Sequence, residues 1–147
     1  MNCLITSKQI DHIGIAVSDL ESSVSFYTNI LGLTCYGYET VESEHVRVAF
    51  LKIGEVSLEL LQGLNDQSAI TKFIKKKGEG IHHIALRVEN ANEDLGELKR
   101  NGIQLINETA KVGAHGNLVG FLHPHSTKGV LLELCQRNSN MYKEDEE

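Results

Sequence analysis

The sequence lacks long hydrophobic runs and has no excess of basic residues. No apolar stretch approaches the roughly 18 residues that a helix needs to cross a membrane. The chain does not open with a charged segment followed by an apolar one, so no secretory signal is visible. The formal net charge of −6 argues against a nucleic-acid surface. We therefore expect neither a membrane nor a nucleic acid as a partner.

Cysteine is also scarce. The chain carries only Cys3, Cys35 and Cys135, an odd and small number for a disulfide framework. In a protein without a secretory signal such thiols are expected to be reduced. The cysteine content therefore favours a cytoplasmic location.

The rest of the composition is that of an ordinary globular protein. Of the 147 residues, 41% are hydrophobic and 23% are charged, which is usual for a soluble domain. This length is enough to bury a substantial core. We expect a single domain over residues 1–147.

Two stretches combine a regular apolar face with a nearly bare one. Residues 10–17 alternate with period 2, so the apolar side chains of a strand here share one face. The opposite face carries His12 with only glycine and alanine for neighbours. Residues 82–88 repeat the pattern, and there His83 stands on the barer face. Each stretch therefore presents one exposed imidazole over open space.

The two stretches belong to a longer repeat. His83 follows His12 by 71 positions, and Glu133 follows Glu59 by 74 positions. Each glutamate lies between two leucines in a predicted strand. The nearly constant offset indicates duplication of a unit of about 70 residues.

Each copy is expected to be a β-α-β-β-β module, because runs of period 2 and period 3.6 alternate in that order. Module one is expected at about 10–62 and module two at about 82–136, with a lead-in at 1–9, a connecting helix at about 67–77 and an acidic, frayed tail at 138–147. The predicted strands are 10–17, 33–41, 46–53, 56–62, 82–88, 103–106, 118–122 and 130–136. The first module helix is expected to run from a cap at either Ser18 or Asp19 to about Leu31, and the second from about Asn90 to Asn101. The predicted fold class is therefore α+β.

The repeated histidines and glutamates are candidate metal ligands. A carboxylate on the inner face of a strand is costly to bury unless it is paired or bound to a cation. Two imidazoles and two carboxylates on one concave surface would meet that cost by binding a divalent ion. Such a set suits Zn, Co, Ni, Mn or Fe better than Ca or Mg. We expect the ligands to be His12, Glu59, His83 and Glu133.

The other histidines give weaker signals. Strand alternation places His82 on the face opposite to His83, so His82 is not expected to be a ligand. His115, in Gly-Ala-His-Gly, and His123, in Phe-Leu-His-Pro, flank the last pair of strands. Both are candidates for lining a pocket.

Several stretches together resemble a known family. They read IDHIGIAVSDL, FYTNILGL, VAFLKIGEVSLELLQ, GEGIHHIALRV and KVGAHGNLVGFLHPHSTKGVLLELCQ. Over about 10–137 the chain resembles the vicinal oxygen chelate superfamily, which includes glyoxalase I, and within it the methylmalonyl-CoA epimerases. The GAHG, FLHP and KGVLLEL segments are the most particular to the epimerases. The resemblance implies two modules that form a cupped, incomplete barrel, and a homodimer.

The resemblance also implies a mechanism. The epimerases interconvert (2R)- and (2S)-methylmalonyl-CoA by moving the C2 proton through an enolate that a divalent metal (Co, Mn, Zn or Ni) stabilises. By position, the metal ligands fall on His12, Glu59, His83 and Glu133, and the two glutamates are the expected acid and base. One departure concerns Val48, because some epimerases carry a separate glutamate there and glutamine in place of Glu59.

Contacts to an acyl-CoA substrate are expected from four further residues. Arg87 shares a strand face with His83, and Lys111 is a second cation that could meet a carboxylate or CoA phosphates. His115 and His123 are the candidate pocket residues named above. We expect all four to be substrate-binding residues.

Three other functions remain open. Glyoxalase I of bacteria uses a His-Glu-His-Glu metal set as well, so the ligands alone do not separate it from an epimerase. A non-catalytic ligand-sequestering protein of the bleomycin-resistance type has no need of four metal ligands. An extradiol dioxygenase would use two histidines and one glutamate around iron.

Overall fold

The computed structural model describes residues 3–140, which form two compact units. The first unit is residues 12–83, and the second consists of residues 3–11 and 84–140. Strands β1 (Ile10–Ala16) and β5 (Gly80–Arg87) contribute residues to both units. Within residues 3–140 no helix has the length and apolar character needed to traverse a bilayer.

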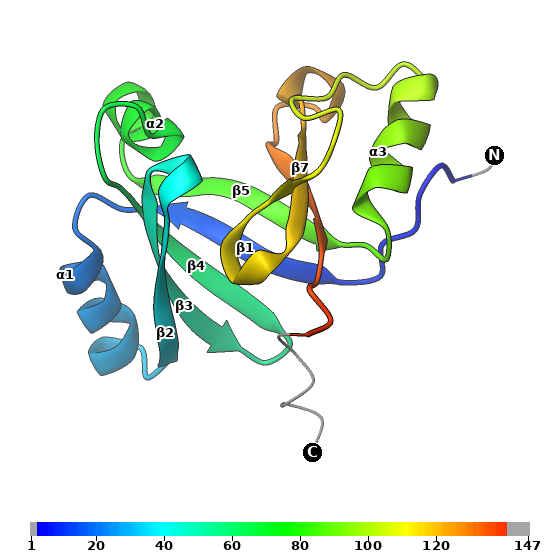
Figure 1. The fold of residues 1–147 in the computed structure, drawn as a ribbon. Helices are drawn as coiled ribbons and strands as arrows, with labels where there is room; N and C mark the ends of the chain where they lie inside the picture. The colour runs from blue at the N-terminus through cyan, green and yellow to red at the C-terminus, as the bar shows by residue number, and fades with distance from the viewer. Residues whose placement is uncertain (1–2, 141–147) are drawn as a thin grey trace. The chain divides into compact units, whose positions relative to one another are not determined.

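The first unit is a sheet with helices at its sides (Figure 1). Its strands follow the order β2-β3-β4-β1, with β1 parallel to β4 and the other neighbours antiparallel. Its remaining elements are α1 (Leu20–Ser25), the π-helical turn η1 (Phe26–Ile30), β2 (Thr34–Val41), the 3₁₀ turn η2 (Glu42–Glu44), β3 (Val46–Ile53), β4 (Val56–Gly63) and α2 (Ala69–Lys77).

Alternation along these strands separates a core face from a polar face. On the core face, leucines of β3 and β4 pack against α1, with Leu51, Leu60 and Leu20 each 0% exposed. The opposite side, which we call the polar face, carries His12 and Glu59. The sequence predicted this division, because period 2 sends neighbouring residues to opposite sides of a strand.

The first helical segment reaches the predicted end near Leu31, but it is α-helical only to Ser25 and π-helical from Phe26 to Ile30. Of the two candidate caps, Asp19 caps α1, since its Oδ1 accepts a hydrogen bond from the Ser22 N–H at 3.1 Å. The helix then widens into η1, where Thr28 Oγ1 donates to the Val24 carbonyl at 2.8 Å. That carbonyl is the one that the Thr28 amide would use in an α-helix, so the hydroxyl competes with the regular ladder.

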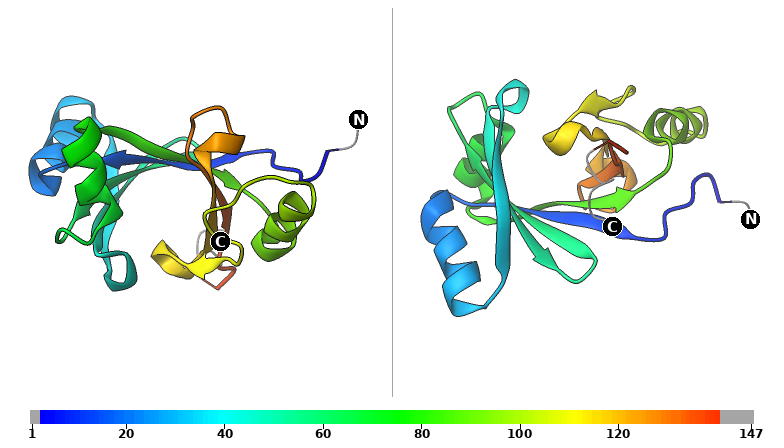
Figure 2. Two further views of the ribbon diagram at one scale, coloured as in Figure 1. Left: turned by 90° about the horizontal axis from the view of Figure 1, so that it is seen from above. Right: turned by 60° about the horizontal axis from the view of Figure 1, so that its bottom comes forward.

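The second unit repeats the plan of the first. Its strands follow the order β5-β8-β7-β6, with β5 parallel to β8 and the other neighbours antiparallel. Figure 2 shows its helix α3, in lime, beside these strands. Its elements after β5 are α3 (Ala91–Arg100), β6 (Lys111–Val112), the 3₁₀ turn η3 (Ala114–Gly116), β7 (Leu118–Leu122), the 3₁₀ turn η4 (Pro124–Ser126) and β8 (Leu132–Gln136).

One pair of hydrogen bonds repeats in both units. The Gln62 side-chain oxygen accepts from the Leu20 amide at 2.7 Å, and the Gln136 side-chain oxygen accepts from the Ala91 amide at 2.9 Å. In each unit the last residues of the final strand therefore satisfy a free N–H in the first turn of the helix. This match supports the duplication inferred from the sequence.

The predicted strand at 103–106 is wrong. The structure has only an isolated bridge between Leu105 and Leu122 there, and the strand paired with β7 is instead β6. The Asn107 side-chain oxygen accepts from the Phe121 amide at 2.8 Å. A side chain thus takes the place of a backbone carbonyl, which stops a regular ladder from forming.

The two ends of the described chain are better anchored than predicted. The lead-in is attached at Ser7, whose hydroxyl donates to the Arg87 carbonyl at 2.8 Å, and Ile5 packs against the core beneath α3. At the other end, the Asn138 amide donates to Asn117 Oδ1 at 2.9 Å, so the tail does not fray from that residue. The rest of the predicted acidic tail, 141–147, lies outside the described residues.

The buried leucine Leu60 should dominate the stability of the first unit. Leu60→Ala is expected to lower the free energy of unfolding by about 2–5 kcal/mol, because it leaves a cavity in the core between the sheet and α1. Ile30→Ala is the control, since Ile30 is 70% exposed and should change stability by less than about 0.5 kcal/mol. Urea unfolding would measure both, and equal midpoints would contradict this assignment of the core.

Candidate metal centre

His12 and Glu59 lie side by side on the polar face. β1 and β4 run parallel with Gly14 opposite Glu59, which brings the glutamate next to the histidine in the adjoining row. His12 Nδ1 and Glu59 Oε2 are 2.9 Å apart, and the two residues are only 5% and 9% exposed. A buried carboxylate is costly without a partner, and the imidazole is a suitable one.

His83 meets the other side of the His12 ring. The Nε2 atoms of His12 and His83 are 3.1 Å apart, with the ring planes at 88°. Two bonds of about 2.0–2.1 Å from imidazole nitrogens to one Zn²⁺ can span such a separation. The predicted approach of the two histidines is confirmed, and the paired nitrogens suit a divalent metal.

The bare face of β1 has a physical reason at Gly14. A Cβ added to Gly14 would lie 2.8 Å from His83 Nε2 and still closer to other atoms of the ring. Only glycine leaves room for the imidazole at this point. The sequence signal of a glycine beside His12 was therefore a signal of close approach.

Strand alternation sends the Cβ atoms of His82 and His83 to opposite sides of β5, and the prediction that His82 is not a ligand stays a prediction. The two rings nevertheless meet, with their Nδ1 atoms 2.9 Å apart. The Nδ1 atom lies close to the backbone, so two neighbouring rings can meet at the strand edge. His82 also packs edge-on against Phe73, with ring centres 5.1 Å apart. Burial, and to a lesser extent the positive charge of Lys77, lowers the pKa of His82 to about 4, so His82 is neutral near pH 7.

Glu133 belongs to the second unit. It lies on β8, opposite Phe121 on β7 and Ala85 on β5, and is 5% exposed. The burial fits the expectation of an inward-facing carboxylate. Its membership of one site with His12, Glu59 and His83 stays a prediction.

Arg87 is already engaged by neighbouring side chains. Its Nε donates to Asp11 Oδ2 at 3.0 Å and its Nη1 to Gln9 Oε1 at 3.0 Å. Arg137 Nε donates to the same Asp11 oxygen at 3.1 Å. Sequence reasoning missed this cluster, because a repeating pattern of apolar and polar residues gives no information on contacts such as that of Asp11 with Arg137, which lie 126 positions apart. Two guanidinium groups share one buried carboxylate, so the cluster keeps a positive charge.

The other predicted substrate residues have different surroundings. Lys111 Nζ lies 6.0 Å from the centre of the Phe121 ring. His115 has a φ of 59° within the η3 turn. His123 Nδ1 accepts from the His125 amide at 3.0 Å and so caps η4. His123 therefore has a local structural task, and substrate binding by these three residues remains a prediction.

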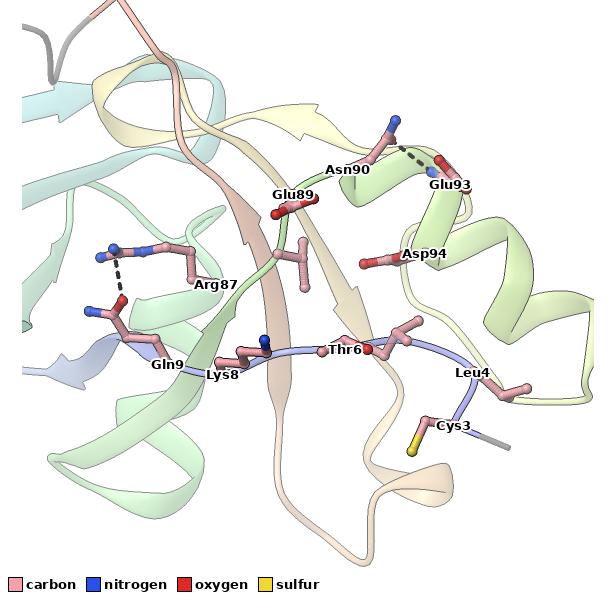
Figure 3. Close-up of a pocket in the computed structure, with 12 residues that line it drawn as sticks. Cys3, Leu4, Thr6, Lys8, Gln9, Arg87, Glu89, Asn90, Glu93 and Asp94 are labelled. Atoms are coloured by element: carbon pink, nitrogen blue, oxygen red, sulfur yellow. Dashed lines mark hydrogen bonds between the residues drawn. The ribbon is translucent and has the colours of Figure 1, made fainter. Parts of the chain in front are cut away.

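A separate pocket of about 650 Å³ lies between the N-terminal segment and the start of α3. Figure 3 shows Lys8 on the segment, with Glu89, Glu93 and Asp94 on the other side. Burial raises the pKa of the Asp94 carboxyl, and the charges of Glu93 and Glu89 raise it further. The pocket contains none of the predicted metal ligands, but the predicted substrate residue Arg87 lines it. The sequence pattern predicts only a lead-in at 1–9 and so gives no sign of this pocket.

Comparisons with known proteins agree with this geometry. Residues 11–121 match the model of the glyoxalase/bleomycin resistance protein/dioxygenase superfamily. The chain belongs to that superfamily. It is 41% identical over 129 residues to the human mitochondrial methylmalonyl-CoA epimerase, which covers 87% of this chain and 73% of the human protein. It is also 28% identical over 123 residues to the lactoylglutathione lyase of Salmonella typhimurium, which covers 83% of this chain and 90% of the lyase.

A solved structure of the same superfamily matches most of the chain. It is a Streptomyces coelicolor methylmalonyl-CoA epimerase variant in complex with 2-nitronate-propionyl-CoA, with a TM-score of 0.87 and 35% identity over 91% of this chain and 97% of that one. The resemblance drawn from the sequence and the predicted α+β fold class are therefore confirmed.

The space beside Gly14 should be essential to the position of the His83 ring. Gly14→Ala is expected to displace the ring and to lower the free energy of unfolding by about 1–3 kcal/mol, the cost of overpacking. A suitable control is Gly96→Ala in α3, where the new methyl meets only the end of Arg100 at 3.4 Å. Urea unfolding and the His83 ring signals in NMR spectra would test this, and a Gly14→Ala protein with unchanged His83 signals would contradict it.

Proposed function

We propose that this protein is a metal-dependent methylmalonyl-CoA epimerase that interconverts the (2R) and (2S) forms of its substrate. The observation that carries the proposal is the buried cluster of His12, Glu59 and His83. It occurs in a chain that is 41% identical to one epimerase and 35% identical to another. The C2 proton of such a substrate lies between a thioester and a carboxylate, so its removal is within the reach of a general base.

The metal would be held by the two imidazoles and two carboxylates. His12 and His83 would use Nε2, and Glu59 and Glu133 would complete the set with Co, Mn, Zn or Ni as the ion. To join it, the Glu59 carboxylate would have to leave His12 Nδ1, where it lies in this structure. When bound, the metal would supply positive charge close to the thioester oxygen, where negative charge develops. The buried position of His12, Glu59 and Glu133 keeps water away and strengthens that effect.

Glu59 and Glu133 are the proposed pair that moves the proton. One carboxylate would take it from one side of C2, and the other, as the acid, would return it to the opposite side. Glu59 Oε2 is hydrogen-bonded to His12 Nδ1, so Glu59 must use its other oxygen or release the histidine.

The remaining parts of the proposal come from the sequence. Arg87, Lys111, His115 and His123 would contact the acyl-CoA, and of these Arg87 and Lys111 carry the charge that its phosphates or carboxylate require. A single domain, a homodimer and a cytoplasmic location complete the proposal. They follow from the resemblance and composition described above.

A lactoylglutathione lyase is the second candidate. The His-Glu-His-Glu metal set suits it equally, and a lyase is among the relatives at 28% identity. The lower identity and the epimerase-like GAHG and FLHP segments favour the epimerase. A non-catalytic binding protein is the third candidate.

Deuterium exchange should separate these candidates. In D₂O the protein is expected to place deuterium at C2 of methylmalonyl-CoA while the (2R) and (2S) forms equilibrate, measured by mass spectrometry and chiral analysis. Glu59→Gln and Glu133→Gln keep an oxygen but remove the base, so epimerisation should fall by about 10²–10⁴-fold. Each variant could still exchange deuterium into one epimer.

Two outcomes would contradict the epimerase proposal. Turnover of methylglyoxal–glutathione hemithioacetal without exchange at C2 of methylmalonyl-CoA would establish the lyase instead. Binding of either substrate without turnover in the presence of metal would favour the binding protein.

Removal of either histidine should weaken metal binding. His12→Ala and His83→Ala each delete a neutral ligand, so the metal content measured after dialysis and the epimerase rate should fall together by orders of magnitude. His45→Ala is a matched control, because His45 directly follows the η2 turn and its Nδ1 is hydrogen-bonded to the exposed Asn65 side chain at 3.2 Å. Full metal content in a His12→Ala or His83→Ala protein would show that this histidine is structural only.

A further inference from the structure

We propose that His82 is a positioning residue that selects the metal-binding tautomer of His83. The inference rests on the metal centre of the proposed function. It concerns Nδ1 of His83, the ring nitrogen that does not contact His12. The observation behind it is the contact between the two neighbouring imidazoles, His82 Nδ1 and His83 Nδ1, at 2.9 Å.

Both nitrogens of His83 face another imidazole. Nε2 lies 3.1 Å from His12 Nε2, and Nδ1 lies 2.9 Å from His82 Nδ1. A neutral imidazole carries one proton, on one nitrogen or the other. To bind a metal through Nε2, His83 must carry its proton on Nδ1. That proton then points at His82, which has to accept it with an unprotonated Nδ1.

His82 is held in place for this task by α2. Its ring packs edge-on against Phe73, with ring planes at 84°. Lys77, at the end of the same helix, lies 5.9 Å from the Phe73 ring centre. The orientation of His82 is therefore set in part by α2, which carries Phe73.

The two proposed metal-binding histidines, His12 and His83, differ in the group that contacts Nδ1. His12 Nδ1 faces the Glu59 carboxylate, which when ionised can only accept a hydrogen bond, so the proton of His12 stays on Nδ1. His83 Nδ1 faces a second imidazole, which can donate or accept. The tautomer of His12 is thus set by Glu59, whereas that of His83 depends on the tautomer of His82.

Metal binding should then move two protons within their own rings. Without metal, His12 is protonated on Nδ1, so its Nε2 has no proton and can only accept a hydrogen bond. The 3.1 Å contact between the two Nε2 atoms is then a hydrogen bond only if His83 carries its proton on Nε2. Nδ1 of His83 is then unprotonated and accepts a hydrogen bond from His82, which must carry its proton on Nδ1. A metal at the Nε2 pair reverses both assignments, so His83 becomes protonated on Nδ1 and His82 on Nε2, with no change in the total number of protons.

Nitrogen-15 NMR of the histidine rings, without metal and with Zn²⁺, tests this directly. We expect Zn²⁺ to exchange the protonated and unprotonated nitrogen signals within both His83 and His82. If Zn²⁺ shifts His12 and His83 but leaves the His82 tautomer unchanged, this inference is overturned and the metal centre stands. If Zn²⁺ changes none of the three rings, the metal centre itself is wrong and the inference falls with it.

Two variants of His82 provide a matched comparison. His82→Phe keeps a ring against Phe73 but has no acceptor, and it should weaken Zn²⁺ binding by about 10–100-fold, the usual loss for a partner of a metal-bound histidine. His82→Asn places an oxygen where Nδ1 was and should recover most of that affinity. Urea unfolding of the metal-free proteins would report their folding separately. Equal Zn²⁺ affinity of wild type and a folded His82→Phe protein would overturn the proposal.

Discussion

The burial of an imidazole–carboxylate pair is the constraint on which the first unit depends. His12 and Glu59 are withdrawn from water on a sheet face, where an unpaired carboxylate would be strongly destabilising. Their 2.9 Å contact removes much of that cost and also directs Nε2 of His12 toward His83. The strand register follows from the same need, since β1 and β4 must align with Gly14 opposite Glu59 to bring the two side chains together.

Space is the second requirement, and the small residues of β1 provide it. The ring of His83 occupies the volume that a side chain at Gly14 would fill. On the other side of the sheet, packing of leucines against α1 holds the strands rigidly. A site with buried polar groups on one side and a close-packed core on the other can keep its ligands in one geometry without a metal in place.

Sequence periodicity predicted most strands and the pairing of the two histidines, because both depend on regular alternation. It failed where a single side chain replaced a backbone partner, as Thr28 does in η1 and Asn107 does before β6. It did not predict the contact between the rings of His82 and His83, because alternation describes the direction of Cβ and not the reach of a ring nitrogen near the strand edge. The cluster of Asp11 with its two arginines left no trace in the pattern, since it joins distant parts of the chain.

The glutamine at the end of each module's last strand affects how the module folds. Gln62 reaches back 42 positions to the start of α1, and Gln136 reaches back 45 positions to the start of α3. The first turn of each helix gains this partner only after the last strand has joined the sheet. Helix and strand are thereby coupled across the full length of the module, so neither is expected to open alone, and local fluctuations at the helix start report on the integrity of the strand that carries the glutamate.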